Sequence, residues 1–236
     1  MSTHHHLDDV VASIQKRWGD KALRRLEQVP TGTGIPTGCA DLDRLFGVGG
    51  LPRGAVTCLS GHPTSGKTTL ALDMLARVQG DGEVTVYIDM TGALDAEYAE
   101  TRGIDLDRLL IVWPQPPALG LDIARDLIRS GGAGLVVVDT GDCLPGGPGP
   151  RAVPVSLAAR RSPYALVCLT DAPGSMSMGL MARADVHLRV ERQRWLCNVS
   201  GINGYEARIT LLKSRFGPPG QAVTLPIRLF ERRLGP

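Results

Sequence analysis

One segment of the sequence has the residue types and spacing of a phosphate-binding loop. Residues 61–68 read Gly-His-Pro-Thr-Ser-Gly-Lys-Thr, which fits the pattern GxxxxGK[ST]. Glycines let successive backbone N–H groups point inward at a helix N-terminus, where the helix dipole also favours an anion. In such loops the lysine reaches the β- and γ-phosphates of a nucleotide, and the hydroxyl after it holds Mg²⁺. The pattern predicts a nucleotide-phosphate site made by Gly61, Thr64, Ser65, Gly66, Lys67, Thr68 and Thr69.

An acidic residue after an apolar run is the second candidate for this chemistry. Residues 135–138 read Leu-Val-Val-Val, and Asp139 follows them directly. Ligands of open α/β sheets bind at the carboxyl ends of the strands, so we expect Asp139 to join Thr68 at a Mg²⁺ ion. The alternative is an aspartate that only caps a loop.

The segments around these residues alternate between strand and helix patterns. Helical patterns cover residues 67–79 and 121–128, and Tyr98 lies in a short helical stretch. Strand-like apolar runs cover 55–60, 84–88, 109–112, 135–138 and 165–169. This order predicts an α/β fold, with a mostly parallel central sheet and helices on both faces.

The C-terminal part has a different pattern. Two strand-like runs, 186–196 and 207–213, flank residues 198–204, in which Asn203-Gly204 is a strong signal for the turn of a hairpin. We expect these runs and residues 222–230 to extend the sheet with antiparallel strands. The Pro- and Gly-rich residues 141–154 and the small residues 172–179 are predicted loops.

The first 30 residues are predicted to form an element of their own. Apolar residues from Leu7 to Trp18 have helical spacing, and the Pro and Gly residues of 30–38 indicate a linker. We therefore divide the chain into an N-terminal helical element, residues 1–30, and a core, residues 31–236.

Composition limits the classes of protein that fit. The 236 residues are 43% hydrophobic and 21% charged, with a net charge of +2, which excludes a largely disordered chain. The sequence contains no apolar run of about 18 residues, so we expect a cytoplasmic protein without a membrane span. Residues 181–236 carry ten basic and four acidic side chains, which suggests a face for phosphates, nucleic acid or an acidic partner. The alternative is a solvated sheet edge.

Several spaced motifs resemble the core of the bacterial RecA recombinase family. They are Ile35-Pro36-Thr37-Gly38, the residues 49–54 before the phosphate loop, Tyr87-Ile88-Asp89, Ala93-Leu94-Asp95 with Tyr98-Ala99, and residues 103–110. The resemblance covers most of residues 7–140 and is weaker over about 180–217. It implies a RecA-like P-loop core that binds ATP with Mg²⁺.

The resemblance also implies roles for particular residues. Asp95 and Tyr98 match positions that contact and stack on adenine. Lys213 and Arg215 match paired lysines that reach the ATP of the neighbouring subunit in a filament. The helix in residues 1–30 resembles one that packs on an adjacent subunit or partner, so we expect a RecA-type filament or a self-oligomer.

Four departures from RecA argue against simple equivalence. The glutamate that activates the attacking water is replaced by Thr91, which cannot take a proton near pH 7, so slow or absent hydrolysis is expected. Asp171 replaces the glutamine that senses the γ-phosphate. Both DNA-binding loops are cut down, and the sequence stops at Pro236 without the RecA C-terminal domain.

Three hypotheses follow. The first is a hydrolysis-poor adaptor of DNA repair, recombination or SOS-type damage-induced mutagenesis, similar to ImuA-type accessory proteins, that acts on RecA filaments or translesion polymerase partners. The second is a minimal DNA-dependent ATPase that binds single-stranded DNA through Arg192 and Arg194 beside Trp195, with water positioned by Asp89 or Asp142. The third is another RecA-fold ATPase of the helicase or clock type.

Overall fold

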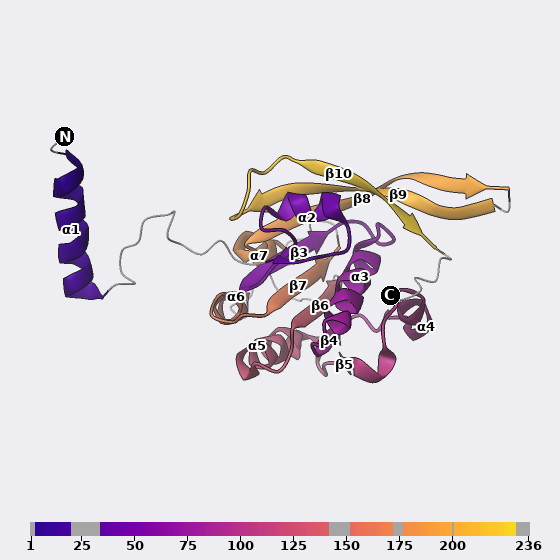
Figure 1. Ribbon diagram of the computed structural model, residues 1–236. Helices are drawn as coiled ribbons and strands as arrows, with labels where there is room; N and C mark the ends of the chain where they lie inside the picture. The colour runs from indigo at the N-terminus through magenta and orange to yellow at the C-terminus, as the bar shows by residue number, and fades with distance from the viewer. Residues whose placement is uncertain (1–2, 20–33, 142–151, 172–176, 200, 230–236) are drawn as a thin grey trace. The chain divides into compact units, whose positions relative to one another are not determined.

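The computed structural model describes residues 3–19, 34–141, 152–171, 177–199 and 201–229 (Figure 1). The chain divides into two compact units, residues 1–31 and 32–236. In the first unit the described element is helix α1 (Thr3–Trp18), which carries Lys16 and Arg17 in its last turn, where the helix dipole favours cations. None of the helices in the described part is long and apolar enough to cross a membrane.

The second unit is built on an eight-stranded sheet with the strand order β10-β9-β8-β3-β7-β6-β4-β5. Strands β5, β4, β6, β7, β3 and β8 run parallel to their neighbours, whereas β8, β9 and β10 pair antiparallel. The strands are β3 (Ala55–Ser60), β4 (Thr85–Asp89), β5 (Leu109–Val112), β6 (Leu135–Gly141), β7 (Ala165–Thr170), β8 (Val186–Asn198), β9 (Gly201–Ser214) and β10 (Ala222–Arg228). A separate two-stranded sheet pairs β1 (Gly34–Ile35) with β2 (Leu51–Pro52).

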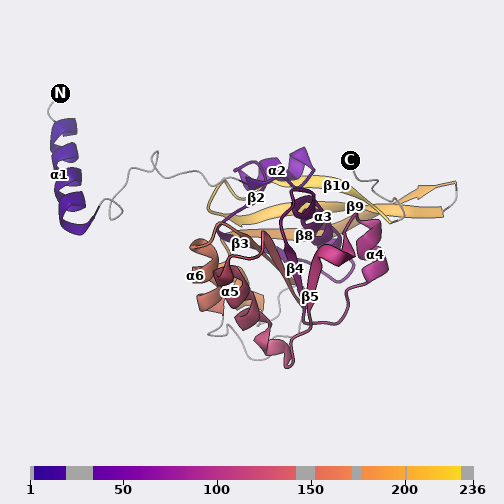
Figure 2. The ribbon, with the colours of Figure 1, turned by 60° about the horizontal axis from the view of Figure 1, so that its bottom comes forward.

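Helices cover both faces of the large sheet. They are α2 (Ala40–Phe46), α3 (Lys67–Gly80), α4 (Ala96–Thr101), α5 (Gly120–Ser130), α6 (Ala152–Arg160) and α7 (Ser177–Arg183). Figure 2 shows α5 and α6 beside each other and away from α3 and α4. The predicted α/β class with an antiparallel C-terminal extension is therefore confirmed.

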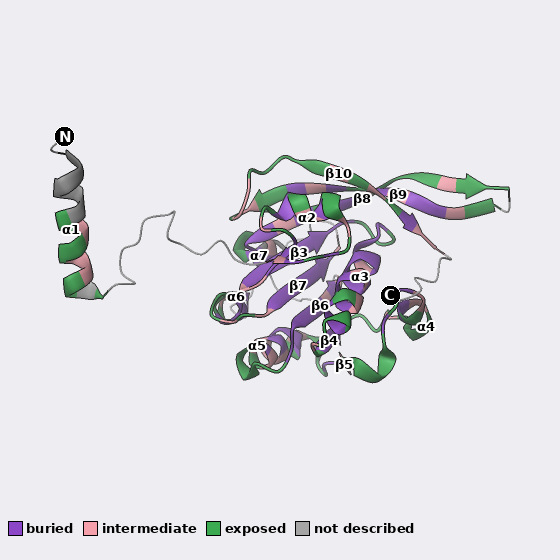
Figure 3. Cartoon of the chain, viewed as in Figure 1, coloured by how far each residue is buried: buried purple, intermediate pink, exposed green. Residues whose placement is uncertain are grey.

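The apolar strand runs follow from this two-sided cover. Side chains alternate between the faces of a strand, so Val137 packs in the core under α2 and α3 while Val136 and Val138 pack in the core under α5, α6 and α7. All of these strand residues are buried (Figure 3). A strand buried on both faces needs apolar residues at consecutive positions, which explains Leu-Val-Val-Val before Asp139.

Parallel pairing gathers the strand ends that matter for chemistry. Asp89 at the end of β4 lies opposite Asp139 of β6, and Gly141 of β6 lies opposite Thr170 at the end of β7. The loop after β3 starts at the same edge, since Ser60 pairs with Thr170. Segments distant in sequence therefore meet at one edge of the sheet.

Three local predictions were wrong. Strand β8 ends at Asn198, which pairs with Gly201 at the start of β9, so Asn203-Gly204 lies inside β9 and not in the turn of the hairpin. A Cβ atom at Gly204 would lie 2.3 Å from the carbonyl oxygen of Ile227, so this glycine permits close approach of β10 and is not a turn residue.

The other two errors concern the predicted loops. Residues 152–154 belong to α6, whose first turn tolerates Pro154 because a proline there loses no helical hydrogen bond. Residues 177–179 belong to α7. Gly141, the first residue of the other predicted loop, belongs to β6. The remaining parts of the two predicted loops, 142–151 and 172–176, lie outside the described residues.

A buried carboxylate joins the antiparallel extension to the parallel core. Asp185, which is 0% exposed, accepts hydrogen bonds from the Val56 N–H at 3.1 Å, from Arg160 Nη2 at 2.8 Å and from Arg215 Nη1 at 2.8 Å. Burial raises the pKa of Asp185, but the hydrogen bonds from Arg215, Arg160 and Val56 outweigh burial and hold this pKa below its ordinary value.

We predict that Asp185→Asn lowers the free energy of unfolding by about 2 kcal/mol at pH 7, because the arginines lose their charged acceptor. A lowered native-state pKa contributes stability above about pH 4 and loses it as the pH falls through that pKa. The gap between wild type and variant in urea unfolding should therefore close at acid pH. Asp126→Asn, an exposed carboxylate on α5, is the control and should change stability much less. A gap of equal size at pH 7 and pH 3 would contradict this account.

Candidate nucleotide site

The segment between β3 and α3 forms a turn that leaves helix N–H groups free of side-chain caps. Thr64 has a φ of 64° and is the one non-glycine residue with positive φ among the described residues. Gly66 has a φ of 107°, and a Cβ atom there would lie 2.4 Å from Ile227 Cδ1. No side chain caps α3 at Gly66. The loop therefore has the backbone conformation and the helix terminus that bind anions.

Lys67 is folded inward at the centre of this loop. Its Nζ atom donates to the carbonyl oxygens of Gly61 at 2.7 Å and His62 at 3.1 Å, and to Asp171 Oδ1 at 3.0 Å. The residue is 6% exposed. The ammonium group is thus buried, and its bonding partners come from the loop itself and from the end of β7.

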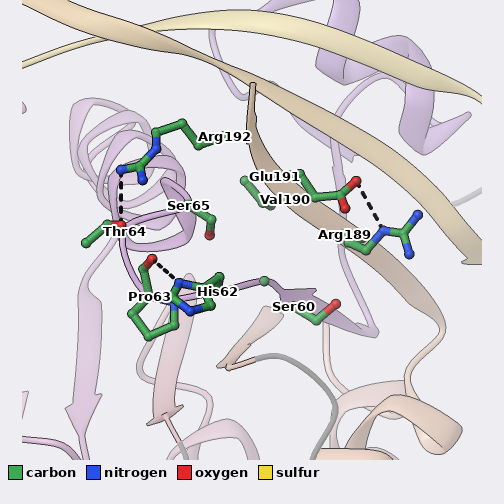
Figure 4. A pocket seen from close by; sticks show the side chains of 10 residues that line it. Ser60, His62, Pro63, Thr64, Ser65, Arg189, Val190, Glu191 and Arg192 are labelled. Atoms are coloured by element: carbon green, nitrogen blue, oxygen red, sulfur yellow. Dashed lines mark hydrogen bonds and ion pairs between the residues drawn. The ribbon is translucent and has the colours of Figure 1, made fainter. Parts of the chain in front are cut away.

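A cavity of about 310 Å³ lies against the loop, between residues 60–65 and residues 189–192 of β8 (Figure 4). Ser65 lines it, and Ser65 Oγ is buried without a hydrogen-bond partner. A buried hydroxyl without a partner costs free energy unless a ligand or water satisfies it. Together with the uncapped helix N-terminus, this orphaned hydroxyl fits a phosphate group.

Tyr87 of β4 connects the two predicted magnesium ligands. Its hydroxyl donates to Asp139 Oδ2 at 2.8 Å and also interacts with the side chain of Thr68. Burial raises the pKa of Asp139 above its ordinary value, against the opposing hydrogen bonds from Tyr87 and the Gly141 N–H. The structure therefore brings Thr68 and Asp139 together, through a tyrosine that the sequence reasoning did not select.

The described residues contain no group of three or more His, Cys, Asp or Glu side chains arranged to hold a metal. Mg²⁺ usually binds through one or two carboxylates together with substrate phosphates and waters. Thr68 and Asp139 at the edge of the loop fit that kind of shared site, because the phosphates would complete the coordination.

Thr91 is committed to a local turn. Its hydroxyl and its N–H both donate to Asp89 Oδ1, at 2.9 and 3.1 Å. Asp89 also accepts from the N–H groups of Gly92 at 2.8 Å and Leu94 at 3.1 Å. Burial raises the pKa of Asp89, but these backbone and side-chain hydrogen bonds lower it overall. A carboxylate whose pKa is lowered by several hydrogen-bond donors is a poor base, which argues against Asp89 as the substitute for the missing glutamate.

The predicted adenine residues lie beside the start of α3. The Tyr98 hydroxyl is 2.8 Å from Thr69 Oγ1, so Tyr98 reaches the loop helix. Asp95 Oδ1 accepts from the Tyr98 N–H at 3.1 Å and caps α4. Asp95 thus fixes the short helix that carries Tyr98, a role that fits its position whether or not it contacts a base.

The two predicted trans-interface cations are bound to their own chain. Lys213 Nζ donates to the carbonyl oxygen of Ala182 at 2.8 Å, and Arg215 Nη1 pairs with Asp185. Both contacts lie near the start of β8, because Lys213 pairs with His187 in the sheet. To reach a neighbouring subunit, Arg215 must leave a buried carboxylate.

The predicted nucleic-acid residues also have internal partners. Arg192 Nη1 donates to Thr64 Oγ1 at 3.2 Å, and its guanidinium carbon lies 4.4 Å from the ring centre of Trp195. Trp195 in turn packs edge-to-face on Tyr205, with ring centres 5.8 Å apart. Arg194 forms a bidentate pair with Glu206 at 2.7 and 2.8 Å. Arg192 of β8 therefore contacts the phosphate loop, which sequence spacing alone could not indicate.

Comparisons with known proteins agree with this geometry. A family profile for the RecA N-terminal domain matches residues 5–146. RecA of Aquifex pyrophilus is 33% identical over an alignment that covers 91% of this chain and 71% of that protein. RecA of Desulfotalea psychrophila is 42% identical over 57% of this chain and 38% of that protein. The crystal structure of the RadB recombinase has the same fold, with a TM-score of 0.65 and 23% identity over 84% of this chain and 97% of that one. The chain belongs to the RecA family.

Proposed function

We propose that this protein binds ATP with Mg²⁺, hydrolyses it poorly and serves DNA repair or recombination as an adaptor. In this proposal the nucleotide state controls contact with a RecA-type filament, with further copies of the chain or with translesion polymerase partners. The observation that carries this proposal is that, at one sheet edge, the groups for binding phosphate are present whereas the residue for activating water is missing. The phosphate loop keeps its lysine and an unsatisfied Ser65 hydroxyl, whereas position 91 offers a hydroxyl that already donates to Asp89.

The bound nucleotide would use the residues in a simple division of roles. The uncapped N–H groups of α3 and Ser65 Oγ hold phosphate oxygens, and Lys67 neutralises the terminal phosphates. Mg²⁺, held by Thr68 and Asp139, supplies further neutralisation of phosphate charge. Tyr98 offers a ring beside α3 on which the adenine stacks.

Poor hydrolysis follows from the described carboxylates. Asp89 accepts hydrogen bonds that lower its pKa, Asp139 is assigned to the metal, and Asp171 is paired with Lys67. Asp142, a further acid that follows β6 in sequence, lies outside the described residues. Removal of a general base typically costs about 10²- to 10⁴-fold in rate, which leaves a protein that binds ATP for long periods.

A first prediction concerns binding. Lys67→Ala should weaken the affinity for MgATP by tenfold or more, about 1.4 kcal/mol, because the terminal phosphates lose their buried cation. Titration calorimetry with a slowly hydrolysed ATP analogue measures this. Lys16→Ala, which removes an exposed lysine of α1, is the matched control and should bind like wild type. Equal affinity of wild type and Lys67→Ala would contradict nucleotide binding at this loop.

A second prediction concerns turnover. Wild-type turnover of MgATP should be close to that of Lys67→Ala, with and without single-stranded DNA. Thr91 is exposed, so Thr91→Glu can be accommodated and should raise turnover by about 10²-fold or more by restoring a base. Strong DNA stimulation of the wild type would instead support the minimal DNA-dependent ATPase, the alternative function.

A third prediction concerns assembly. The double variant Lys213→Ala with Arg215→Ala should lose ATP-dependent association with itself or with a RecA filament, measured by sedimentation. Arg215→Ala also removes a hydrogen-bond partner of the buried Asp185 and can destabilise the fold, so the experiment needs a control for loss of stability. Arg160→Ala removes the other arginine from the same carboxylate and should lower stability without abolishing association. Loss of association in both variants would assign the effect to folding.

A further inference from the structure

The phosphate-loop lysine has no free hydrogen-bond donor. A lysine ammonium group has three N–H bonds, and Lys67 Nζ has three acceptors: two loop carbonyl oxygens and Asp171 Oδ1. Of these acceptors only Asp171 carries a negative charge. Asp171 therefore occupies the place at Lys67 that the terminal phosphates of a nucleotide would take.

Asp171 is held at this place by the backbone. It follows β7 directly, and the Gly61 N–H donates to the carbonyl oxygen of Thr170 at 3.3 Å. This hydrogen bond ties the first residue of the phosphate loop to the end of β7. The side chains of Lys67 and Asp171 are 7% and 25% exposed, so solvent screens their interaction only in part.

Asp171 lies among other acidic side chains, and its carboxylate would stay close to any phosphate that replaced it at Lys67. Asp89 ends β4, Asp139 lies near the end of β6, and Asp171 follows β7; these three neighbouring strands bring the three aspartates to one edge of the sheet. Asp171 Oδ2 points toward Gly141, where an added Cβ atom would lie 3.8 Å from it and 2.7 Å from Thr91 Cγ2. When phosphates take Lys67, the Asp171 carboxylate is left beside them and repels them.

We propose that Asp171 is the resident counter-ion of Lys67, that it competes with the terminal phosphates of the nucleotide, and that it thereby sets nucleotide affinity. This inference rests on the proposed nucleotide function. It makes Asp171 a specificity-determining residue: the competition falls most heavily on triphosphates, because the lysine of such a loop reaches the β- and γ-phosphates.

The test is Asp171→Asn, which keeps the size of the side chain and an acceptor for Lys67 but removes the charge. Titration calorimetry should show about tenfold or more tighter binding of a slowly hydrolysed MgATP analogue than in wild type, and a smaller gain for MgADP. Magnesium tripolyphosphate, which has no nucleobase, should also bind Asp171→Asn more tightly than wild type. Asp126→Asn removes one exposed carboxylate of α5 and should bind like wild type.

Thermal unfolding gives an independent readout. Without ligand, Asp171→Asn should melt below wild type, because Lys67 loses its counter-ion. With saturating MgATP analogue, the variant should gain more in melting temperature than wild type does. A higher melting temperature of Asp171→Asn without ligand, or a smaller gain than in wild type with the analogue, would overturn the proposal that Asp171 competes with phosphates.

The outcomes separate this inference from the proposed function. Equal affinity of wild type and Asp171→Asn, both binding, overturns the counter-ion role alone. Weaker binding by Asp171→Asn overturns it as well and assigns the carboxylate to a ligand-holding role. Absence of binding in both proteins, with both shown to be folded, overturns the nucleotide function and this inference with it.

Discussion

The buried ammonium group of Lys67 requires hydrogen-bond acceptors that offset the cost of burying its charge, and several surrounding elements supply them. A lysine at 6% exposure must find acceptors for its charge inside the protein. The loop after β3 directs the carbonyl oxygens of Gly61 and His62 toward Lys67 Nζ. The neighbouring parallel strand β7 ends at the residue before Asp171, which places the Asp171 carboxylate beside the same Nζ atom. The position of Asp171 requires the parallel register of β3 and β7, in which Ser60 lies opposite Thr170.

The antiparallel extension supports the loop from the other side. Ile227 of β10 and Tyr205 of β9 approach Gly66 so closely that a Cβ atom would lie 2.4 Å from Ile227 Cδ1 and 3.0 Å from the Tyr205 hydroxyl. Arg192 of β8 donates to Thr64 and stacks over Trp195. The loop is therefore packed between the parallel sheet edge and the long strands, which restricts the conformations that it can adopt without a ligand.

Local signals in the sequence indicated the parts of this arrangement that depend on local physics. The glycine and lysine spacing of the loop and the apolar runs of β3, β6 and β7 are encoded by neighbouring residues, and both were predicted. Contacts between distant residues were not: the pairing of Lys67 with Asp171, 104 positions apart, and of Arg192 with Thr64, 128 apart, depends on strand order. Asn203-Gly204 misled for a related reason, because Gly204 is required by the approach of β10 and not by a turn.

Two aspartates at neighbouring strand ends illustrate how similar positions acquire different chemistry. Asp89 and Asp139 are partners in the register of β4 and β6. Asp89 accepts from Thr91, Gly92 and Leu94, so the turn that follows β4 supplies its hydrogen bonds. Asp139 accepts from Tyr87 and the Gly141 N–H, and these two hydrogen bonds do not outweigh burial, so its pKa is raised while that of Asp89 is lowered.

A carboxylate has about four lone-pair directions, and among the described residues fewer donors reach Asp139 than Asp89, so Asp139 keeps more capacity to bind a further group. Desolvation without enough donors means that the charged form of Asp139 gains most from a nearby cation, since a cation offsets the cost of burying that charge. The same comparison explains why the turn at Thr91 matters beyond the missing glutamate. Because that turn directs its donors to Asp89, Asp139 is the better placed of the two carboxylates for a metal ion at this edge.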